Sequence, residues 1–398
     1  MSKVLSINAG SSSLKFQLIK MPEEKVLVKG VIERIGLEAS IFGMEIGDRE
    51  IEFVQDIKDH SEAVELLLKN LKAEKVVEDL AEIVGVAHRV VHGGEKFTDS
   101  IIIDEEVIAS IEAASDLAPL HNPVNLIGIE AFSEALPEAT SVAVFDTAFH
   151  TTMEPEAFIY PTPYEWYQKY GVRRYGFHGT SHKYVSQRAA EIIGKKVEDI
   201  NMITAHIGNG VSLCAVKNGK SVDTTMGMTP LAGIAMGTRS GDIDPAIIEY
   251  ISVKEERSIK GVIKKLNKES GLLGISGVSS DGRDIRKGIE EGNDRCYLAH
   301  RVQVKRIIYF IAAYYAYMGG ADAIVFTAGV GENDDLTRQS VCDGLKVLGV
   351  EIDPDLNART HGKEAMLSTE NSKIKVMVVP TNEELMMARD VFRLMGRL

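Results

Sequence analysis

The chain has 398 residues, of which 44% are hydrophobic and 26% are charged. This composition excludes a disordered or low-complexity protein, and the length allows two domains with separate cores. The formal net charge is −13 and the basic residues are scattered, which argues against nucleic acid or an anionic membrane as a partner.

The N-terminus and the cysteines indicate a cytoplasmic protein. Residues 1–6 lead directly into an apolar run without the basic and long apolar segments of an export signal. Cys214, Cys296 and Cys342 are too few and too far apart for a disulfide framework or a zinc cluster. The longest apolar run, Ile307 to Ala321, is shorter than the roughly 20 residues that span a bilayer. We therefore expect a buried helix there.

A β-hairpin is predicted at the start of the chain. Val4 to Ile7 is a short apolar run, and Asn8 to Ser13 is dense in turn-forming residues. Leu14, Phe16 and Leu18 then alternate with polar residues, which is typical of a strand with one buried face.

The same pattern recurs about half a chain length later. Met202 to Ala205 leads through the polar, glycine-rich segment His206 to Gly210 into the apolar segment Val211 to Val216. A second pair of predicted strands, Val142 to Phe145 and Ala323 to Phe326, ends in small polar residues in each half. From these pairs we infer an internal duplication, with chance recurrence of hairpins in an α/β protein as the alternative.

Helical patterns alternate with these strands, which predicts an α/β fold. Near the end of the chain, Lys373 to Val379 is predicted as a strand. Thr381 and Glu384 then form a capping-box pattern for a last helix that ends near Met395. The Pro- and Thr-rich segment Phe149 to Tyr164 is the best candidate for a domain boundary. The other predicted helices cover Ser61–Leu71, Asn122–Leu136, His182–Ile193, Asp244–Ile251 and Asp294–Met318.

The common phosphate-binding signatures are missing. Gly219-Lys220-Ser221 matches the end of a P-loop, but Cys214 stands where the first glycine belongs. What remains is three glycine-rich segments at strand ends, whose backbone N–H groups can approach an anion closely. Each alone is also typical of an ordinary tight turn, but their shared placement favours a polyphosphate site. They are Asn8–Ser13, His206–Gly210 and Gly329–Asn333.

Three arginines and one histidine are candidate anion-binding residues. Arg89, Arg239 and Arg283 lie in glycine- or serine-rich segments, and planar guanidinium groups suit carboxylate and phosphate oxygens. His178 directly precedes a predicted helix that Thr180 or Ser181 could cap, and anions are favoured at helix N-termini. His178 could therefore donate a hydrogen bond to a phosphoryl group, or it could simply pack within a loop.

Asp146, at a strand end, and Glu383, at the start of the last helix, are the acidic candidates for a magnesium site. Mg²⁺ keeps several waters, so one carboxylate and the amide oxygen of Asn8 would suffice. Acidic residues are favoured in the first turn of any helix, which is the alternative explanation of Glu383. His88 and His92 lie four residues apart in a strand-like segment, where a zinc pair is not expected.

Segments spread over nearly the whole chain resemble the acetokinase family, a branch of the actin-like ATPase superfamily. The most specific are Asn8 to Lys15, Gly176 to His182 and Thr229 to Pro245. The resemblance implies an α/β fold of two duplicated actin-like (ribonuclease H-like) ATPase domains with an active-site cleft between them. The first domain would cover residues 1–150 and the returning C-terminal helix, 384–398. The second, nucleotide-binding domain would cover residues 151–383.

The resemblance also implies an activity. Family members transfer the γ-phosphoryl group of ATP reversibly to acetate, giving acetyl phosphate and ADP by direct in-line attack of the carboxylate. The transfer depends on Mg²⁺, with Mn²⁺ as an alternative ion, and a homodimer is implied. One alternative is a propionate or butyrate kinase of the same family. A more remote alternative is an actin- or chaperone-like ATPase that drives a partner protein.

The positions that match the family's motifs imply roles for individual residues. Asn8 and Glu383 would form the magnesium site, and Lys15 would contact ATP. Arg89 and Arg239 would hold the acetate carboxylate and the transferring phosphate. His178 would stabilise the transition state, and Asp146 corresponds to the family's catalytic acidic residue.

Two further groups of residues follow from the same resemblance. The acyl group would lie in a small apolar pocket formed by Val91, Leu120, Phe177 and Pro230. Gly282 departs from the bulkier, commonly aromatic residue of family members. The nucleotide site would consist of His206, Ile207, Gly208, Asn209, Gly210, Asp281, Gly282, Arg283, Gly329, Val330, Gly331, Glu332 and Asn333.

Physical chemistry sharpens two of these assignments. A small carboxylic acid, with a pKa on the order of 4 to 5, is ionised at pH 7 and needs no general base. We therefore expect Asp146 to orient Arg89 or a magnesium-bound water rather than to move protons. Val91 is bulkier than the alanine expected in a propionate-preferring relative, which favours acetate as the substrate.

Overall fold

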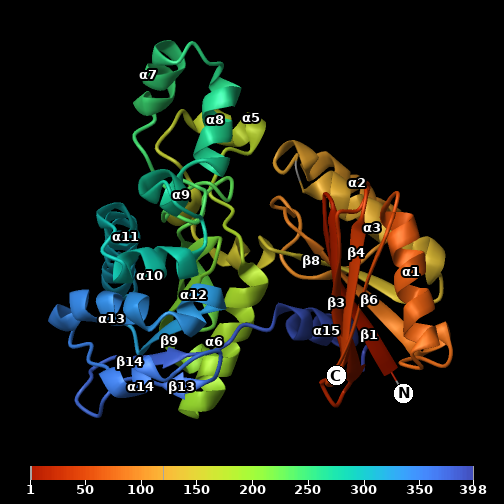
Figure 1. The fold of residues 1–398 in the computed structure, drawn as a ribbon. Helices are drawn as coiled ribbons and strands as arrows, with labels where there is room; N and C mark the ends of the chain where they lie inside the picture. The colour runs from red at the N-terminus through yellow and green to blue at the C-terminus, as the bar shows by residue number, and fades with distance from the viewer. Residues whose placement is uncertain (1, 120, 398) are drawn as a thin grey trace. The chain divides into compact units, whose positions relative to one another are not determined.

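The computed structural model describes residues 2–119 and 121–397. The chain divides into two compact units (Figure 1). Unit 1 comprises Met1–Phe149 and Asn382–Leu398, and unit 2 comprises His150–Thr381. The chain leaves unit 1 at the start of the segment predicted as a boundary. These bounds place Asn382 and Glu383 in unit 1 and His150 in unit 2, whereas the sequence-based bounds were 1–150 with 384–398, and 151–383.

Unit 1 is built on one mixed sheet. Its strands, in spatial order, are β5 (Arg49–Gln55), β4 (Ser40–Ile46), β3 (Lys25–Glu33), β2 (Ser13–Met21), β1 (Ser2–Gly10), β6 (Ile83–Val90), β8 (Thr140–Phe145) and β7 (Ile101–Ile102). β1 and β2 form the predicted antiparallel hairpin, and β6 and β8 continue the sheet parallel to β1. Residues that follow β1, β6 and β8 therefore lie at one edge of the sheet.

Helices cover both faces of this sheet (Figure 1). Leu67 and Leu71 of α1 and Phe132 of α3 are buried in the core with Leu5 and Val86 of the sheet. α15 lies on the other face and packs against β1, β6 and β8. The helices of unit 1 are α1 (His60–Ala73), α2 (Glu105–Ala113), α3 (Asn122–Ala135) and α15 (Glu383–Leu394), with 3-10 turns η1 (Leu80–Glu82), η2 (Ala114–Asp116) and η3 (Ala148–Thr152), the last running into unit 2.

The start of α15 differs from the predicted capping box. Asn382 is the N-cap, and its side chain accepts the backbone N–H of Leu385. Thr381 is not the cap because the helix begins one residue later than the pattern predicts, and the Thr381 hydroxyl hydrogen-bonds with Ser181 Oγ at 2.8 Å. Ser6 Oγ of β1 donates to the Glu384 carbonyl oxygen at 2.8 Å, which holds the first turn of the helix against the sheet.

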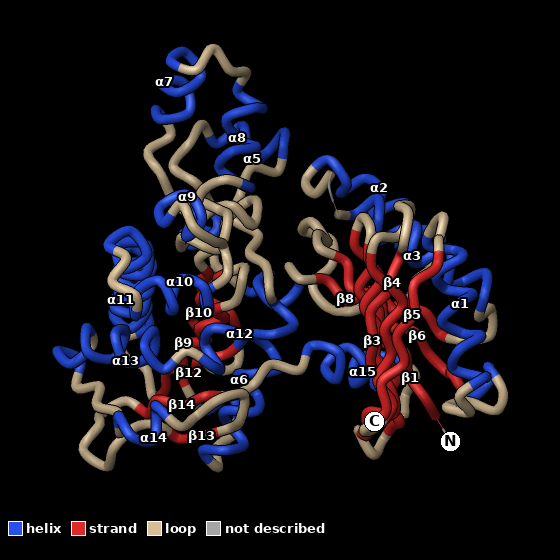
Figure 2. The backbone as a smooth tube through the Cα atoms, viewed as in Figure 1, coloured by secondary structure: helices blue, strands red, loops and turns tan. Residues whose placement is uncertain are grey.

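Unit 2 also has a central mixed sheet, with α6 on one face and α11 on the other (Figure 2). Its strands, in spatial order, are β11 (Lys220–Thr224), β10 (Val211–Lys217), β9 (Asn201–Ile207), β12 (Ala323–Thr327), β14 (Lys375–Val378) and β13 (Ala365–Met366). Its helices are α4 (Pro155–Phe158), α5 (Tyr164–Tyr170), α6 (Gly179–Ile193), α7 (Ala246–Lys254), α8 (Ile259–Lys268), α9 (Gly271–Ser276), α10 (Gly282–Glu290), α11 (Asp294–Met318), α12 (Ala328–Asn333), α13 (Asp335–Gly344) and α14 (Pro354–Ala358), with 3-10 turns η4 (Val197–Asp199) and η5 (Lys346–Leu348).

The two sheets share one strand order. β3-β2-β1-β6-β8 in unit 1 corresponds to β11-β10-β9-β12-β14 in unit 2, with three antiparallel strands followed by two parallel ones in each. The predicted fold class, two α/β units of the actin-like type, is confirmed. One of the two strand pairs used to infer the duplication was wrong. β12 lies beside β9 as β6 lies beside β1, so β12 corresponds to β6 rather than to β8.

Two segments differ from their predicted conformation. Gly329 to Asn333 belongs to the short helix α12 rather than to a turn, because the chain re-enters a helix directly after β12. The apolar run that begins at Ile307 forms the end of α11 and is buried along one side only. Ile307 and Ile311 are buried, whereas Tyr309 is 62% exposed. Among the described residues, no helix is long and apolar enough to cross a membrane.

Candidate active site

Arg89 and Asp146 form a bidentate ion pair in unit 1. Arg89 lies near the end of β6 and Asp146 directly follows β8, so the parallel pairing of these strands places the two side by side. Arg89 Nε and Nη2 donate to Asp146 Oδ1 and Oδ2 at 2.9 and 2.7 Å. The charge of the buried Asp146 carboxylate raises the pKa of Arg89 further above its ordinary value. Nη1 of Arg89 has no partner in the described part of the chain and remains available to an anion.

Glu383 brings a second carboxylate close to this pair. Burial of the carboxyl group at the start of α15 raises the pKa of Glu383 to about 7, although the charge of Arg89 acts in the opposite direction. Lys15, which pairs with Asn8 across the β1–β2 hairpin, also lowers this pKa. No side-chain hydrogen bond joins the Asn8 amide or the Glu383 carboxylate to another described residue. Both groups therefore keep oxygens free for a cation.

Val91 is anchored by a side chain that the sequence analysis did not single out. The Val91 N–H donates to Asn125 Oδ1 at 3.2 Å, and Asn125 Nδ2 donates to the Ala9 carbonyl oxygen at 3.1 Å. Asn125 thus ties the segment after β6 to the end of β1. An Asn within a helical pattern carries no sequence signal for this role. Leu120, also predicted for the acyl pocket, lies outside the described residues.

His178 is the N-cap of α6 and adopts a left-handed backbone conformation with φ of 57°. One of Thr180 and Ser181 was expected to cap the helix. Neither does, because α6 begins at Gly179 and both residues lie buried in its first turn. His178 Nδ1 hydrogen-bonds with Ser212 Oγ at 2.8 Å. The imidazole stacks on that of His206, with ring centroids 4.0 Å apart. These contacts fix the position of the ring.

His178 and Arg239 meet at Gly210, in the turn between β9 and β10. A Cβ atom on Gly210 would lie 2.8 Å from Arg239 Nη2 and 3.2 Å from His178 Nε2. Arg239 Nη1 donates to the Pro230 carbonyl oxygen at 2.8 Å, and no carboxylate pairs with Arg239 among the described residues. Burial lowers the pKa of Arg239 from its usual value. An unpaired, partly buried guanidinium beside an imidazole favours an anionic ligand.

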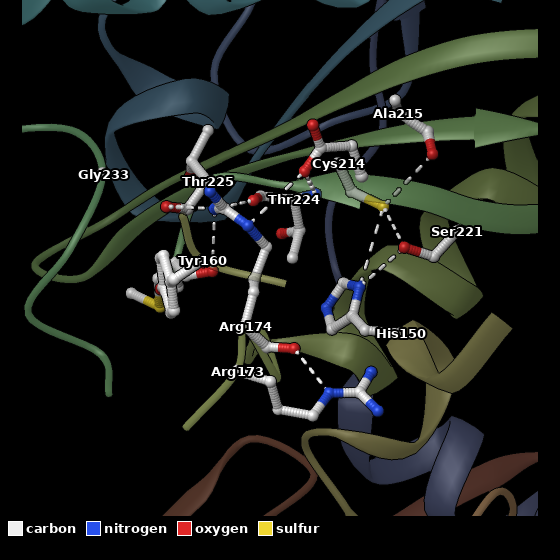
Figure 3. Close-up of polar contacts among 12 residues, drawn as sticks. His150, Tyr160, Arg173, Arg174, Cys214, Ala215, Ser221, Thr224, Thr225 and Gly233 are labelled. Atoms are coloured by element: carbon white, nitrogen blue, oxygen red, sulfur yellow. Dashed lines mark hydrogen bonds and ion pairs between the residues drawn. The ribbon is translucent and has the colours of Figure 1, made fainter. Parts of the chain in front are cut away.

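The backbone of Phe177 contacts a buried polar cluster of His150, Ser221 and Cys214, whose mutual contacts are drawn in Figure 3. His150 Nε2 hydrogen-bonds with the Phe177 carbonyl oxygen at 2.9 Å, and His150 Nδ1 with Ser221 Oγ at 2.8 Å. Cys214 Sγ donates to the same Ser221 oxygen. Gly176, with φ of 77°, must be a glycine because a Cβ would lie 2.7 Å from the His150 ring. Phe177 is consequently 2% exposed and has little freedom to move.

Arg174 binds the end of β11 and the segment that follows it. Its Nη1 contacts the carbonyl oxygens of Thr224, Thr225 and Met226 (Figure 3). This segment leads toward Pro230, the remaining residue predicted for the acyl pocket. Pro230 is partly buried, and its carbonyl oxygen positions Arg239.

Two of the segments predicted to bind the nucleotide contact each other. A Cβ on Gly282 would lie 3.1 Å from Val330 Cγ2, so a bulkier residue at Gly282 would require Val330 to move. Asp281 is the N-cap of α10 and accepts a 2.6 Å hydrogen bond from Arg283 Nη2. The Arg283 side chain is 91% exposed.

The third nucleotide segment is linked to the loop that carries Arg239. The Gly237 N–H donates to the Asn209 carbonyl oxygen at 3.0 Å, and the Gly237 backbone lies directly against the Asn209 side chain. His206 and Ile207 lie within β9 rather than in the turn itself. Glu332 Oε1 accepts the Thr381 N–H at 3.1 Å, and Asn333 Nδ2 donates to the Gly329 carbonyl oxygen at 2.9 Å. Glu332 thus ties α12 to the segment at Thr381, whereas the Asn333 contact lies within α12.

Comparison with known proteins gives a consistent result. The model of the acetokinase family matches residues 3–389. An acetate kinase from Shouchella clausii (strain KSM-K16) is 55% identical over 99% of this chain and 100% of its own length. An acetate kinase from Geobacillus kaustophilus (strain HTA426) is 57% identical over 99% of each chain.

Solved structures also match this chain over nearly its whole length. Acetate kinase from Porphyromonas gingivalis superimposes with a TM-score of 0.96 at 46% identity, covering 99% of this chain and 100% of that one. A propionate kinase from Francisella tularensis has a TM-score of 0.93 at 41% identity, covering 98% of this chain and 99% of that one. The fold is therefore common to kinases that are named for different acids.

Proposed function

The chain belongs to the acetokinase family, and on that premise we propose that it is an acetate kinase. In the forward direction a carboxylate oxygen of acetate attacks the γ-phosphorus of ATP. The new P–O bond forms as the bond to the bridging oxygen breaks, and ADP leaves with the electron pair. Acetate is already ionised at neutral pH, so no proton has to be removed from the nucleophile.

His178 and Arg239 are the proposed ligands of the transferring phosphoryl group. In a loose transition state the negative charge is spread over the equatorial oxygens, and catalysis consists mainly of positioning and electrostatic stabilisation. The side chains of His178 and Arg239 meet at Gly210, and no carboxylate neutralises Arg239 within the described residues. This unpaired guanidinium beside an imidazole is the observation that carries the proposal.

Arg89, oriented by Asp146, is the proposed ligand of the acetate carboxylate in unit 1. Val91 is proposed as the residue of unit 1 that contacts the acyl group, and its side chain is buried. Because Val91 leaves less room than an alanine would, acetate is favoured over propionate.

Asn8 and Glu383 are the proposed magnesium ligands. Both present oxygens without a partner in the described part of the chain, and burial raises the pKa of Glu383 to about 7 despite the nearby charges of Arg89 and Lys15. Bound Mg²⁺ would neutralise phosphate charge and orient the nucleotide. A homodimer is a further proposal, and it rests on the family resemblance alone.

The experiment that tests this function measures ATP-dependent formation of acetyl phosphate, trapped with hydroxylamine as the hydroxamate. We expect Arg239→Ala to lower kcat by about 10² to 10³. Arg257→Ala is the matched control because the Arg257 side chain forms an ion pair with Glu255 in which both side chains are exposed. Circular dichroism of both variants checks that they are folded. Equal activities of the two variants would contradict the role of Arg239, and ATP hydrolysis independent of acetate would contradict the function.

A further inference from the structure

Behind His178 lies a continuous line of hydrogen-bonded side chains. Thr204 Oγ1 contacts His182 Nδ1 at 2.7 Å, and His182 Nε2 contacts Ser212 Oγ at 2.8 Å. Ser212 Oγ in turn contacts His178 Nδ1 at 2.8 Å. Thr204, His182 and Ser212, which we call the relay, are all 0% exposed. Water is therefore unable to satisfy any donor or acceptor in the relay.

The Thr204 hydroxyl determines the direction of the hydrogen bonds. Among the described residues, its side-chain partner is His182 Nδ1. If Nδ1 donated to Thr204, the hydroxyl hydrogen would have no acceptor, and an unsatisfied buried donor costs about 1–3 kcal/mol. The stable arrangement has the Thr204 hydroxyl donating to Nδ1, which must then carry no proton.

His182 is neutral, so its single N–H lies at Nε2. Burial, together with the nearby His150 and His206, lowers the pKa of His182 well below its usual value. The His150 ring, visible in Figure 3, packs edge-on against His182 with centroids 5.7 Å apart. With the proton on Nε2, His182 donates to Ser212 Oγ.

The hydrogen bond from Ser212 to His178 has the same donor-to-acceptor direction. Its oxygen accepts from His182 Nε2, so its own proton is directed to the remaining partner, His178 Nδ1. Nδ1 is then an acceptor and the proton of His178 resides on Nε2. Nε2 lies with Cε1 at the edge of the ring that faces Gly210, 3.2 Å from the position of a Cβ on that residue, and Arg239 Nη2 lies 2.8 Å from the same position.

We propose that Thr204, His182 and Ser212 are positioning residues that hold His178 as the neutral tautomer with its proton on Nε2, so that the ring always presents a hydrogen-bond donor to an anion at Gly210. A proton on Nδ1 of His178 would require every hydrogen bond of the relay to reverse and would leave the Thr204 hydroxyl without an acceptor. The consequence for catalysis rests on the proposed phosphoryl transfer, whereas the tautomer does not depend on it.

The tautomer is measured directly by long-range ¹H–¹⁵N NMR on protein labelled at its histidines. The chain has ten histidines, and His178→Gln identifies the signals of His178. We expect the unmodified protein to show a protonated Nε2 and an unprotonated Nδ1. A protonated Nδ1 in the unmodified protein would overturn the proposal.

Thr204→Val removes the hydroxyl while preserving the shape of the side chain. We expect the other tautomer of His178 to become detectable and kcat to fall about 3- to 10-fold, less than the loss of a whole donor, with the KM for acetate changed less than twofold. Thr204→Ser restores the hydroxyl and is expected to restore both the tautomer and kcat. An unchanged tautomer in Thr204→Val would contradict the relay.

Thr224→Val is the matched control, because Thr224 is equally buried but its hydroxyl donates to the Leu213 carbonyl oxygen outside the relay. It is expected to leave the His178 tautomer unchanged. If Thr204→Val does not fold, Ser212→Ala interrupts the same line one step closer to His178. Failure of the proposed function would appear as no acyl phosphate from any acid, a result independent of the NMR signals.

Discussion

Arg89 and Arg239 carry the same guanidinium group in opposite surroundings. Arg89 is held by both oxygens of Asp146 through Nε and Nη2, so its orientation is set before any ligand arrives. Arg239 has one hydrogen bond to the Pro230 carbonyl oxygen and no carboxylate partner in the described chain. Arg89 is thus suited to orient a bound carboxylate. Arg239, which has no carboxylate partner in the described chain, is suited to bind an anionic ligand.

The first prediction at the residue scale concerns Asp146. Asp146→Asn keeps the shape of the side chain but loses the charge and one acceptor oxygen, so Arg89 loses its fixed orientation. We expect kcat/KM for acetate to fall about 10²-fold, the effect of misplacing a group by roughly 1 Å. The pH–rate profile between pH 6 and 9 is expected to keep its shape. Recovery of activity at high pH would instead make Asp146 a proton acceptor.

The second prediction concerns Val91, which is 9% exposed. Val91→Ala enlarges the proposed acyl pocket by two methyl groups, and we expect the ratio of kcat/KM for propionate to that for acetate to rise about 10-fold. Leu298→Ala is a suitable control, since Leu298 is 53% exposed on α11. A ratio that stays the same in Val91→Ala would remove Val91 from the pocket.

At the scale of elements, the start of α15 controls the charge of the proposed magnesium site. Glu383 has a pKa of about 7, raised chiefly by burial. Below this pH the carboxyl group is neutral and cannot bind a cation, so Mg²⁺ affinity should increase with pH. We expect the apparent affinity for Mg²⁺ in the presence of ADP to be about 10-fold higher at pH 8 than at pH 6.

The control for this pH dependence is Glu383→Gln, which has no titrating group at the position. Any pH effect that remains in this variant belongs to the nucleotide. Isothermal titration at the two pH values compares the proteins directly. An identical pH dependence in both would show that Glu383 is not a ligand.

The β9–β10 turn provides the next prediction. Gly210→Ala would place a Cβ 2.8 Å from Arg239 Nη2, the mobile end of a long side chain. The fold can therefore adjust, while the guanidinium moves from its position. We expect kcat to fall about 10²-fold with little change in Tm. Gly43→Ala, whose Cβ would lie 3.7 Å from the nearest atom, is the control. Full activity in Gly210→Ala would place the anion elsewhere.

Local sequence patterns predicted the helices and strands better than they predicted which strands and side chains lie next to one another. The hairpins β1–β2 and β9–β10 follow from apolar alternation around polar turns, and both are present. The correspondence of β8 with β12 was wrong because two buried strands look alike in sequence, and only their position in the sheet distinguishes them. The Thr381 cap was wrong because the helix begins one residue later, with Asn382 as its N-cap, while the Thr381 hydroxyl contacts Ser181, 200 positions away.

The relay shows the same limit within the site. His182 follows His178 by one helical turn, a spacing that a sequence reading can recognise. Ser212 lies opposite His206 in the register of β9 and β10, and Thr204 precedes His206 by two residues on one face of β9. Hydroxyls inside apolar strands carry no chemical signature of their own, so their link to His178 becomes visible only in three dimensions.

At the scale of the whole molecule, the two units share one strand order but carry different residues at the equivalent hairpins. The β1–β2 hairpin of unit 1 carries Asn8 and Lys15, and the charge of Lys15 interacts with Glu383. The equivalent β9–β10 hairpin of unit 2 carries Gly210, where His178 and Arg239 meet. On the proposed function, equivalent turns would bind a cation in one unit and an anion in the other.

The central claim is that a small carboxylate accepts the phosphoryl group of ATP. Its most direct test compares kcat/KM for acetate, propionate and butyrate in ATP- and Mg²⁺-dependent acyl phosphate formation. We predict the highest value for acetate, with propionate second, since each added methylene is disfavoured by about 1–3 kcal/mol in a pocket of fixed size. A higher value for a longer acid would contradict the acetate assignment, and no acyl phosphate from any acid would contradict the activity itself.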